Sequence, residues 1–227
     1  TLTDDAIVEE FHKEATVYNE DGRDSLADSY FVFNDAMQTI ETVEAYTIQP
    51  DGDRIEVPDS AINTTLDYEV FGAPDFHHIK NYSVSLIGVE YGSRLVTTVR
   101  RTTTLDENDL LSNRQFVFTP VEDFPVEDES FIVRVMTGSD IVYETRQVEN
   151  EPVISEEGDF KVYSWNFKDI EPINREFKMG DYYAHLPLVL ISDSRIGNWE
   201  TQSSELAGLI FKTEIDESVE TITNKIV

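Results

Sequence analysis

Residues 45–58 read AYTIQPDGDRIEVP, a stretch that decides the fold class because a turn signal joins two short alternating runs. Pro50 presets φ for the second position of a type I turn, and Asp51 suits the third. Gly52 can adopt the positive φ that closes a three-residue hairpin loop. The stretch therefore predicts a β-hairpin.

The two runs of this hairpin have the period of two that is typical of strands. Tyr46 and Ile48 share one face of the incoming run, and Ile55 and Val57 share one face of the outgoing run. The same period predicts further strands at residues 14–18, 30–33, 37–48, 82–86 and 95–99, three strands within 114–146, and one at 160–170.

The segments between these strands carry turn signals or lack a clear period. We expect a turn at residues 19–22, with Gly22 at positive φ, and bends at Gly88 and Gly92. Residues 57–81 alternate poorly and contain Pro58, Gly72 and Pro74, so they predict a long irregular surface segment.

The residue pattern changes from strand-like to helix-like near the end of the sequence. Asn198 and Asp216 can each cap a short amphipathic helix, and Trp199 lies at the start of the first one. We predict an all-β fold, a large antiparallel two-sheet sandwich over residues 1–197, followed by a helical tail over 198–227. Because the tail ends in mid-pattern, we expect the natural polypeptide to continue.

The composition supports a folded core and limits the partners. The chain has 227 residues, of which 40% are hydrophobic and 11% aromatic, enough to bury a core. Lys and Arg total 17 against 46 Asp and Glu, a formal net charge of -29. Phosphate binding requires clustered Lys and Arg, and the adjacent Arg100 and Arg101 should point to opposite faces of a strand. We expect no nucleic acid partner and no membrane insertion, and a solvated acidic surface.

Candidate chemistry is sparse. The chain contains no cysteine, which excludes thiol catalysis, disulfides and thiolate metal sites within it. His77 and His78, with Asp75 nearby, offer zinc ligands, but adjacent ligands on an extended segment diverge, so a polar surface loop is the preferred interpretation. The acid clusters at residues 106–109 and 127–129, like Glu122 and Asp123, lack the EF-hand spacing for calcium.

Other catalytic patterns are equally weak. There is no G-x-S-x-G motif, and Gly92 and Ser93 lack its context. Spacing along the sequence cannot reveal which carboxylates form a pair in space. An aromatic platform could form from Trp165, Trp199, Tyr182 and Tyr183, but aromatic residues at strand period favour a core position, which we predict for Trp165. We predict Trp199 to anchor the packing between domains. We therefore predict no catalytic residue, no cofactor and no metal site.

Three segments in order resemble a bacterial family of domains of unknown function that precede transglutaminase-like domains in exported proteins. They are AYTIQPDGDRIEVPDSAI at residues 45–62, VSLIGVEYGSRL at 84–95, and YSWNFKDIEPINREFKMGDYYAHLPLVLISDSRIGNW at 163–199. In that family the catalytic Cys, His and Asp belong to the downstream domain. The family's β domain is also likened to the N-terminal β domain of certain zinc aminopeptidases, which implies a saddle-like double sheet.

The resemblance implies a function without catalysis in this chain. We expect a non-catalytic N-terminal accessory domain of an exported, periplasmic or extracellular bacterial protein. It would pack on a downstream transglutaminase-like or cysteine-protease-like domain and help to present substrate. The alternative is a free-standing β-sandwich that holds a glycan or peptide ligand on one sheet face or on residues 63–81.

Overall fold

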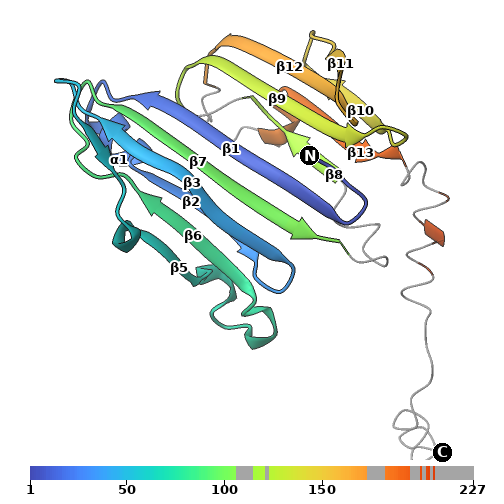
Figure 1. The fold of residues 1–227 in the computed structure, drawn as a ribbon, viewed down its shortest axis with the longest axis horizontal. Coiled ribbons are helices and arrows are strands. Elements are labelled where there is room, and N and C mark those ends of the chain that lie inside the picture. The colour runs from blue at the N-terminus through green and yellow to red at the C-terminus, as the bar shows by residue number, and fades with distance from the viewer. Residues whose placement is uncertain are drawn as a thin grey trace, which may run out of the picture. The chain divides into compact units, whose positions relative to one another are not determined.

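The computed structural model describes residues 1–105, 115–120, 123–172 and 182–194, together with residues 200, 203, 204 and 207. These residues are mostly strands in antiparallel sheets, which confirms the all-β prediction (Figure 1). The chain divides into two compact units, Thr1–Leu105 and Asp106–Val227. Their boundary falls inside the range 1–197 that the sequence presents as one domain. Most of the predicted helical tail, including Trp199, lies outside the described residues.

Unit 1 contains two antiparallel sheets. The first has the strand order β1 (Ala6–Thr16), β7 (Arg94–Thr104), β3 (Gln38–Ile48) and β4 (Arg54–Glu56). The second has the order β2 (Asp28–Asn34), β6 (Ile79–Ser85) and β5 (Ile62–Leu66). Buried side chains from both sheets form one cluster, which includes Phe33, Tyr82, Leu95 and Val99. This shared core makes unit 1 a two-sheet sandwich.

The hairpin at residues 45–58 forms as predicted. Strands β3 and β4 pair through Tyr46 with Glu56 and Ile48 with Arg54. The Gly52 N–H donates to the Gln49 carbonyl at 2.9 Å, and Gly52 has a φ of 97°. The Asp51 carboxylate accepts from the Asp53 N–H at 3.1 Å, which adds a side-chain bond to the same turn.

One face of this hairpin is buried and the other is half-exposed. Thr47 has no exposed surface, and Ala45 is 6% exposed, so the odd-numbered positions enter the core. Tyr46 shares the opposite, half-exposed face with Ile48, and the Arg54 guanidinium lies 3.4 Å from the centre of the Tyr46 ring. The strand also carries a bulge, because its register against β7 shifts between Thr42 and Glu44.

Two local predictions in unit 1 are wrong. Residues 19–22 begin helix α1 (Glu20–Leu26), in which the Asn19 side chain accepts from the Gly22 N–H at 2.8 Å. Gly22 is therefore a helical residue near an N-cap rather than a residue at positive φ. Residues 57–81, expected to be irregular, contain β5 and the start of β6. Gly88 and Gly92 do have positive φ, at 69° and 86°.

Unit 2 is also built from two antiparallel sheets among its described residues. One has the order β10 (Ile141–Arg146), β13 (Leu188–Asp193) and β8 (Gln115–Phe118). The other has the order β11 (Val153–Glu157), β12 (Phe160–Ile170) and β9 (Val126–Met136). Strands β8, β9, β10 and β12 were predicted, whereas β11 and β13 were not.

Aromatic side chains join the two sheets of unit 2. Phe118 of β8 stacks on Phe131 of β9 with ring centres 4.4 Å apart. Tyr143 of β10 meets the edge of Trp165 of β12 at 5.4 Å. Trp165 has no exposed surface, which confirms its predicted core position. The described part of unit 2 is therefore also a sandwich, and aromatic side chains lie between its two sheets.

Candidate functional site

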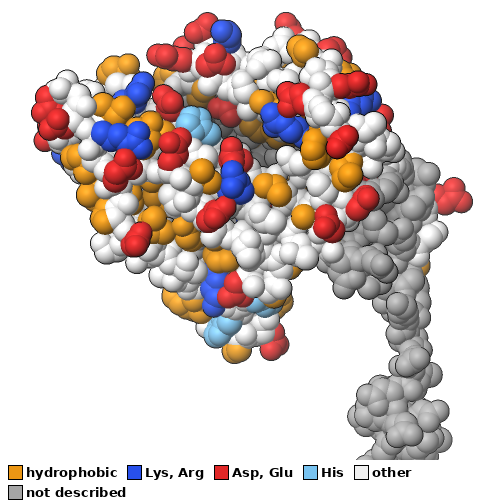
Figure 2. All heavy atoms as spheres, viewed as in Figure 1, with side chains coloured by type: hydrophobic (Ala, Val, Ile, Leu, Met, Phe, Trp, Pro, Cys, Tyr) orange, Lys and Arg blue, Asp and Glu red, His pale blue; other side chains and the backbone are white. Residues whose placement is uncertain are grey.

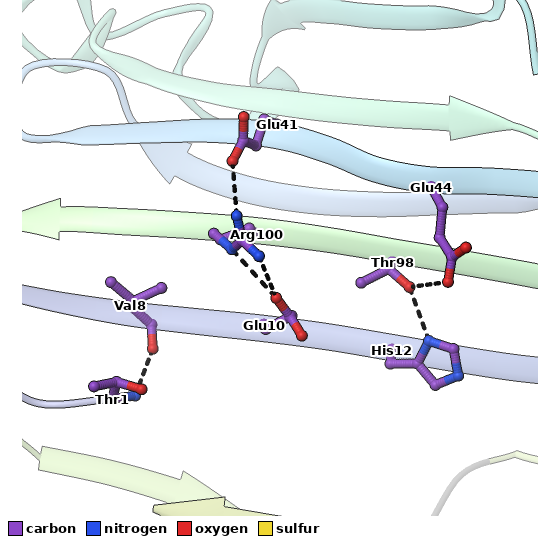
Figure 3. Close-up of polar contacts among 8 residues, drawn as sticks. All are labelled: Thr1, Val8, Glu10, His12, Glu41, Glu44, Thr98 and Arg100. Carbon is purple, nitrogen blue, oxygen red and sulfur yellow. Dashed lines mark hydrogen bonds and ion pairs between the residues drawn. The ribbon is translucent and has the colours of Figure 1, made fainter. Parts of the chain in front are cut away.

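One face of the sheet β1–β7–β3 carries polar side chains that link its three strands. Arg100 lies in register between Glu10 and Glu41, donates to Glu10 Oε2 at 2.8 Å and to Glu41 Oε1 at 3.3 Å, and so bridges three strands (Figure 3). Its neighbour Arg101 points to the opposite face, as predicted, and donates to both carboxylate oxygens of Glu9 at 2.8 and 2.9 Å. The pair therefore forms no basic patch.

The next row on this face contains a histidine, a hydroxyl and a carboxylate. Thr98 Oγ1 donates to Glu44 Oε1 at 3.2 Å, and His12 Nδ1 lies 2.8 Å from the same hydroxyl (Figure 3). Because a hydroxyl has one proton, Nδ1 of His12 is the donor in this arrangement. Thr98 is only 5% exposed. The Thr98 hydroxyl is too buried to attack a substrate, so these three side chains do not form a nucleophile and its base. They form a cross-strand ladder, called here the His12 row.

The acidic side chains are spread over the surface. Figure 2 shows Asp and Glu side chains scattered across the visible face, with Lys and Arg side chains among them. Within the described part of the chain, no group of three or more His, Asp and Glu side chains could hold a metal ion. Residues 106–109 and Glu122 lie outside the described residues.

The predicted histidine loop is present and exposed. Asp75 and His77 are exposed between β5 and β6, and His78 packs its ring 6.1 Å from that of Phe76. Ser93, the other candidate of the sequence, has no exposed surface, and its hydroxyl accepts from the Glu90 N–H at 3.0 Å. Ser93 therefore stabilises a turn and cannot meet a substrate.

The cluster with the most perturbed acids and bases lies in unit 2. Asp140 accepts a short hydrogen bond from the Tyr163 hydroxyl, and Lys161 Nζ lies 3.1 Å from its second oxygen. The Tyr163 hydrogen bond, followed by that of the Ile141 N–H, lowers the pKa of Asp140, while burial opposes the shift. Burial and the bond to Asp140 raise the pKa of Tyr163.

These shifts stabilise the ordinary charge states of the cluster. Hydrogen bonds to Tyr163 and Asp140 also raise the pKa of Lys161. A general acid or base works best when its pKa is moved toward neutral pH, and here each pKa moves away from it. The cluster is therefore suited to holding β12 against the residue before β10, not to proton transfer.

The most exposed aromatic group lies on the segment between β5 and β6, here called the aromatic loop (residues 67–78). Tyr68, Phe71 and Phe76 are 72%, 66% and 55% exposed. Asp67 is buried, and its carboxylate accepts from the Glu69 N–H at 3.0 Å, which fixes the first turn of the loop. In the sequence, these residues are marked by frequent aromatic side chains in a segment where apolar and polar residues do not alternate. The side chains of Tyr182 and Tyr183, proposed as platform residues, lie outside the described set.

No helix among the described residues combines the length and apolar character needed to cross a bilayer. No curated protein matches the sequence. One solved structure that resembles the chain is that of a protein from Parabacteroides distasonis ATCC 8503, described as a "putative protease". It superposes with a TM-score of 0.75 at 20% sequence identity, a likeness that shows the fold alone.

This likeness covers 82% of the chain but 37% of the Parabacteroides protein, so the chain spans little more than a third of that protein's length. The family comparison is more direct. A family model described as a domain of unknown function with a solved structure, DUF3857, matches residues 3–174. The match covers well over half of the 227 residues, and the chain therefore belongs to the DUF3857 family.

Proposed function

We propose that this chain is a non-catalytic N-terminal accessory domain of a longer, exported bacterial protein with a transglutaminase-like or cysteine-protease-like domain downstream. The observation that carries the proposal is the partial match: the chain resembles 37% of a larger protein described as a "putative protease", while it contains no cysteine itself. The accessory domain packs on its catalytic neighbour and helps to present substrate.

The chemistry of the described residues supports a role without catalysis. The candidate serine is buried in a turn, the His12 row has no accessible nucleophile, and the pKa values of Asp140, Lys161 and Tyr163 move away from neutrality. A hydrolase would need convergent acids or bases with the opposite shifts.

The test compares three proteins: the full-length gene product, its variant with the downstream catalytic Cys changed to Ser, and residues 1–227 alone. Hydrolysis of labelled casein and incorporation of a labelled amine are measured. We expect activity only in the unaltered full-length protein. Activity of residues 1–227 alone would overturn the proposal, as would the absence of a Cys, His and Asp set within about one further domain length. Export is tested separately by fractionating cells that express the full-length gene.

A second candidate function is a free-standing module that binds a glycan or a peptide. One observation favours it, namely the three exposed aromatic side chains of the aromatic loop. Exposed aromatic clusters of this kind are typical of interaction sites.

A further inference from the structure

We infer that unit 1 binds an uncharged glycan on the outward face of the sheet β2–β6–β5. This inference deepens the second candidate function by naming ligand and site, and it does not depend on any downstream domain. It starts from the register of the three strands, which lie side by side in Figure 1. The strand pairs place six outward side chains in two rows, called here the neutral face: Tyr30, Ser83 and Asn63 in one row, and Val32, Asn81 and Thr65 in the other.

The side chains of the neutral face point away from the core. The alternate positions of β6, Tyr82 and Val84, are 8% and 0% exposed and belong to the core cluster. Because successive strand residues point to opposite sides, Asn81 and Ser83 point outward. On the flanking strands, Tyr30 is 65% exposed and Val32 is 50% exposed. The neutral face therefore lies on the surface of unit 1, where a ligand can reach it.

The neutral face carries no charge in a chain whose net charge is -29. Charges lie only at its borders: Asp28 is paired with Ser85 in one adjoining row, Asp67 follows Thr65 by two residues, and Arg101, which is ion-paired with Glu9, donates to the Val32 carbonyl at 2.8 Å. Hydroxyl and amide groups both donate and accept hydrogen bonds, as sugar hydroxyls do, whereas a carboxylate only accepts and an ammonium only donates. An uncharged ligand also avoids the cost of desolvating an ion. The composition of the face thus matches a neutral sugar and disfavours a charged one.

The polar groups of this face are available. Across unit 1, all of which is described, the side chains of Asn63, Thr65, Asn81 and Ser83 form no hydrogen bond within the protein. A ligand that offers hydroxyl groups can therefore bond to these side chains directly. Tyr30 adds a ring that stacks on the apolar C–H face of a pyranose ring.

The size of the face fits a short oligosaccharide. Neighbouring strands are about 4.8 Å apart and alternate residues of a strand about 7 Å apart, so three strands and two rows give a platform of roughly 10 by 7 Å. That area accommodates about two hexose rings. The aromatic loop begins one residue after β5, at the end of the sheet where Thr65 lies, so a longer glycan would have further aromatic surface beside it.

The test is affinity electrophoresis of residues 1–227 in native gels that contain one polysaccharide each. The neutral probes are starch, a soluble β-1,3-glucan, xylan and galactomannan, and polygalacturonate is the anionic comparison. We expect at least one neutral polysaccharide to retard the chain and polygalacturonate not to do so. Binding of no neutral polysaccharide overturns the inference, and so does retardation by polygalacturonate alone.

Variants then locate the site. Tyr30→Ala should weaken binding about tenfold, because it removes the stacking ring. Asn81→Asp keeps the shape of the side chain but adds a charge, and should weaken binding as well. Tyr18→Ala is the matched control: Tyr18 is 79% exposed in the same unit but lies off this sheet, and its variant should bind as the parent chain does. Circular dichroism confirms that each variant is folded.

Two outcomes of the variants contradict the inference. If Tyr30→Ala and Tyr18→Ala weaken binding equally, the glycan sits elsewhere. If a peptide array binds the chain and loses binding in the Asn81→Asp variant, while no glycan binds, then the face recognises peptides. All these measurements use residues 1–227 alone. A negative result therefore does not bear on the accessory-domain proposal, which has its own test.

Discussion

Replacing Trp165 separates the value of its packing from the cost of its buried N–H group. Trp165 has no exposed surface and lies within 5.4 to 6.4 Å, ring centre to ring centre, of Tyr143, Phe131 and Tyr163. Its Nε1 is buried without a hydrogen-bond partner. The side chain therefore combines a large favourable term with a smaller unfavourable one.

The two terms predict very different costs for two substitutions. Trp165→Ala removes the whole ring system and should lower the free energy of unfolding by about 3–5 kcal/mol. Trp165→Phe removes only part of the ring system, a packing loss of roughly 1–1.5 kcal/mol on the same scale. It also removes the unpaired N–H, whose burial costs about 1–3 kcal/mol. The net effect of Trp165→Phe should therefore lie between a loss of about 0.5 kcal/mol and a gain of about 2 kcal/mol in the free energy of unfolding.

The assay is urea unfolding followed by far-ultraviolet circular dichroism, because that signal does not depend on the tryptophan that is removed. The comparison requires that the dependence of the unfolding free energy on urea be unchanged among the variants. If Trp165→Phe costs as much as Trp165→Ala, the indole N–H is not a liability and the reasoning fails.

Three further predictions concern single interactions. Tyr163→Phe removes the bond to Asp140 and should cost about 1 kcal/mol at pH 7 after allowance for solvent around the carboxylate. Because the pKa of Asp140 is lowered in the folded state, its bond to Tyr163 stabilises the fold above the unfolded pKa near 4, and this stabilisation is lost as the pH falls below that value. Thermal melts should therefore show a smaller cost of Tyr163→Phe at pH 3 than at pH 7. An equal cost at both pH values would contradict this. Arg101→Met should lower the free energy of unfolding in urea by roughly 2 kcal/mol, because Arg101 makes a bidentate, partly buried ion pair with Glu9. Arg100→Met should lower it clearly less, and the reverse order would refute this. Gly52→Ala should cost about 1 kcal/mol from its positive φ alone, since its added Cβ meets no atom within 4 Å, and an unchanged melting temperature would show that the turn relaxes.

The turn of the hairpin was predictable from the sequence, whereas the structure at residues 19–22 and the pairing of distant strands were not. The hairpin at residues 45–58 follows from three adjacent residues whose φ preferences agree. Strand β5 was missed because Asn63, Thr64 and Thr65 are exposed and give no apolar alternation; its place depends on pairing with β6. Helix α1 was missed because its seven residues, EDGRDSL, have no apolar stripe and are held by the Asn19 cap.

The candidate sites show the same limit. That Arg100 and Arg101 diverge could be predicted, because alternation is a local property of a strand. Their partners could not, since Glu9 and Glu10 lie about ninety positions away in sequence and meet them only through the register of β1 with β7. The neutral face is likewise a product of register, because its six members come from three strands that no local pattern links.

The bulge in β3 holds one residue, Val43, that the pairing with β7 does not use. Before it, the even-numbered Thr42 points inward, where its hydroxyl meets that of Tyr82 at 2.8 Å; after it, the odd-numbered Ala45 and Thr47 do so. The extra residue between them, Val43, is 46% exposed, so most side chains fit at this position. Because Thr42 lies opposite Val99 and Glu44 lies opposite Thr98, loss of Val43 would leave a regular ladder in which Thr42, Ala45 and Thr47 still point inward. Position 43 is therefore the point at which this strand can lose a residue without exchanging its two faces, whereas a deletion elsewhere in the paired strand would turn core side chains toward solvent.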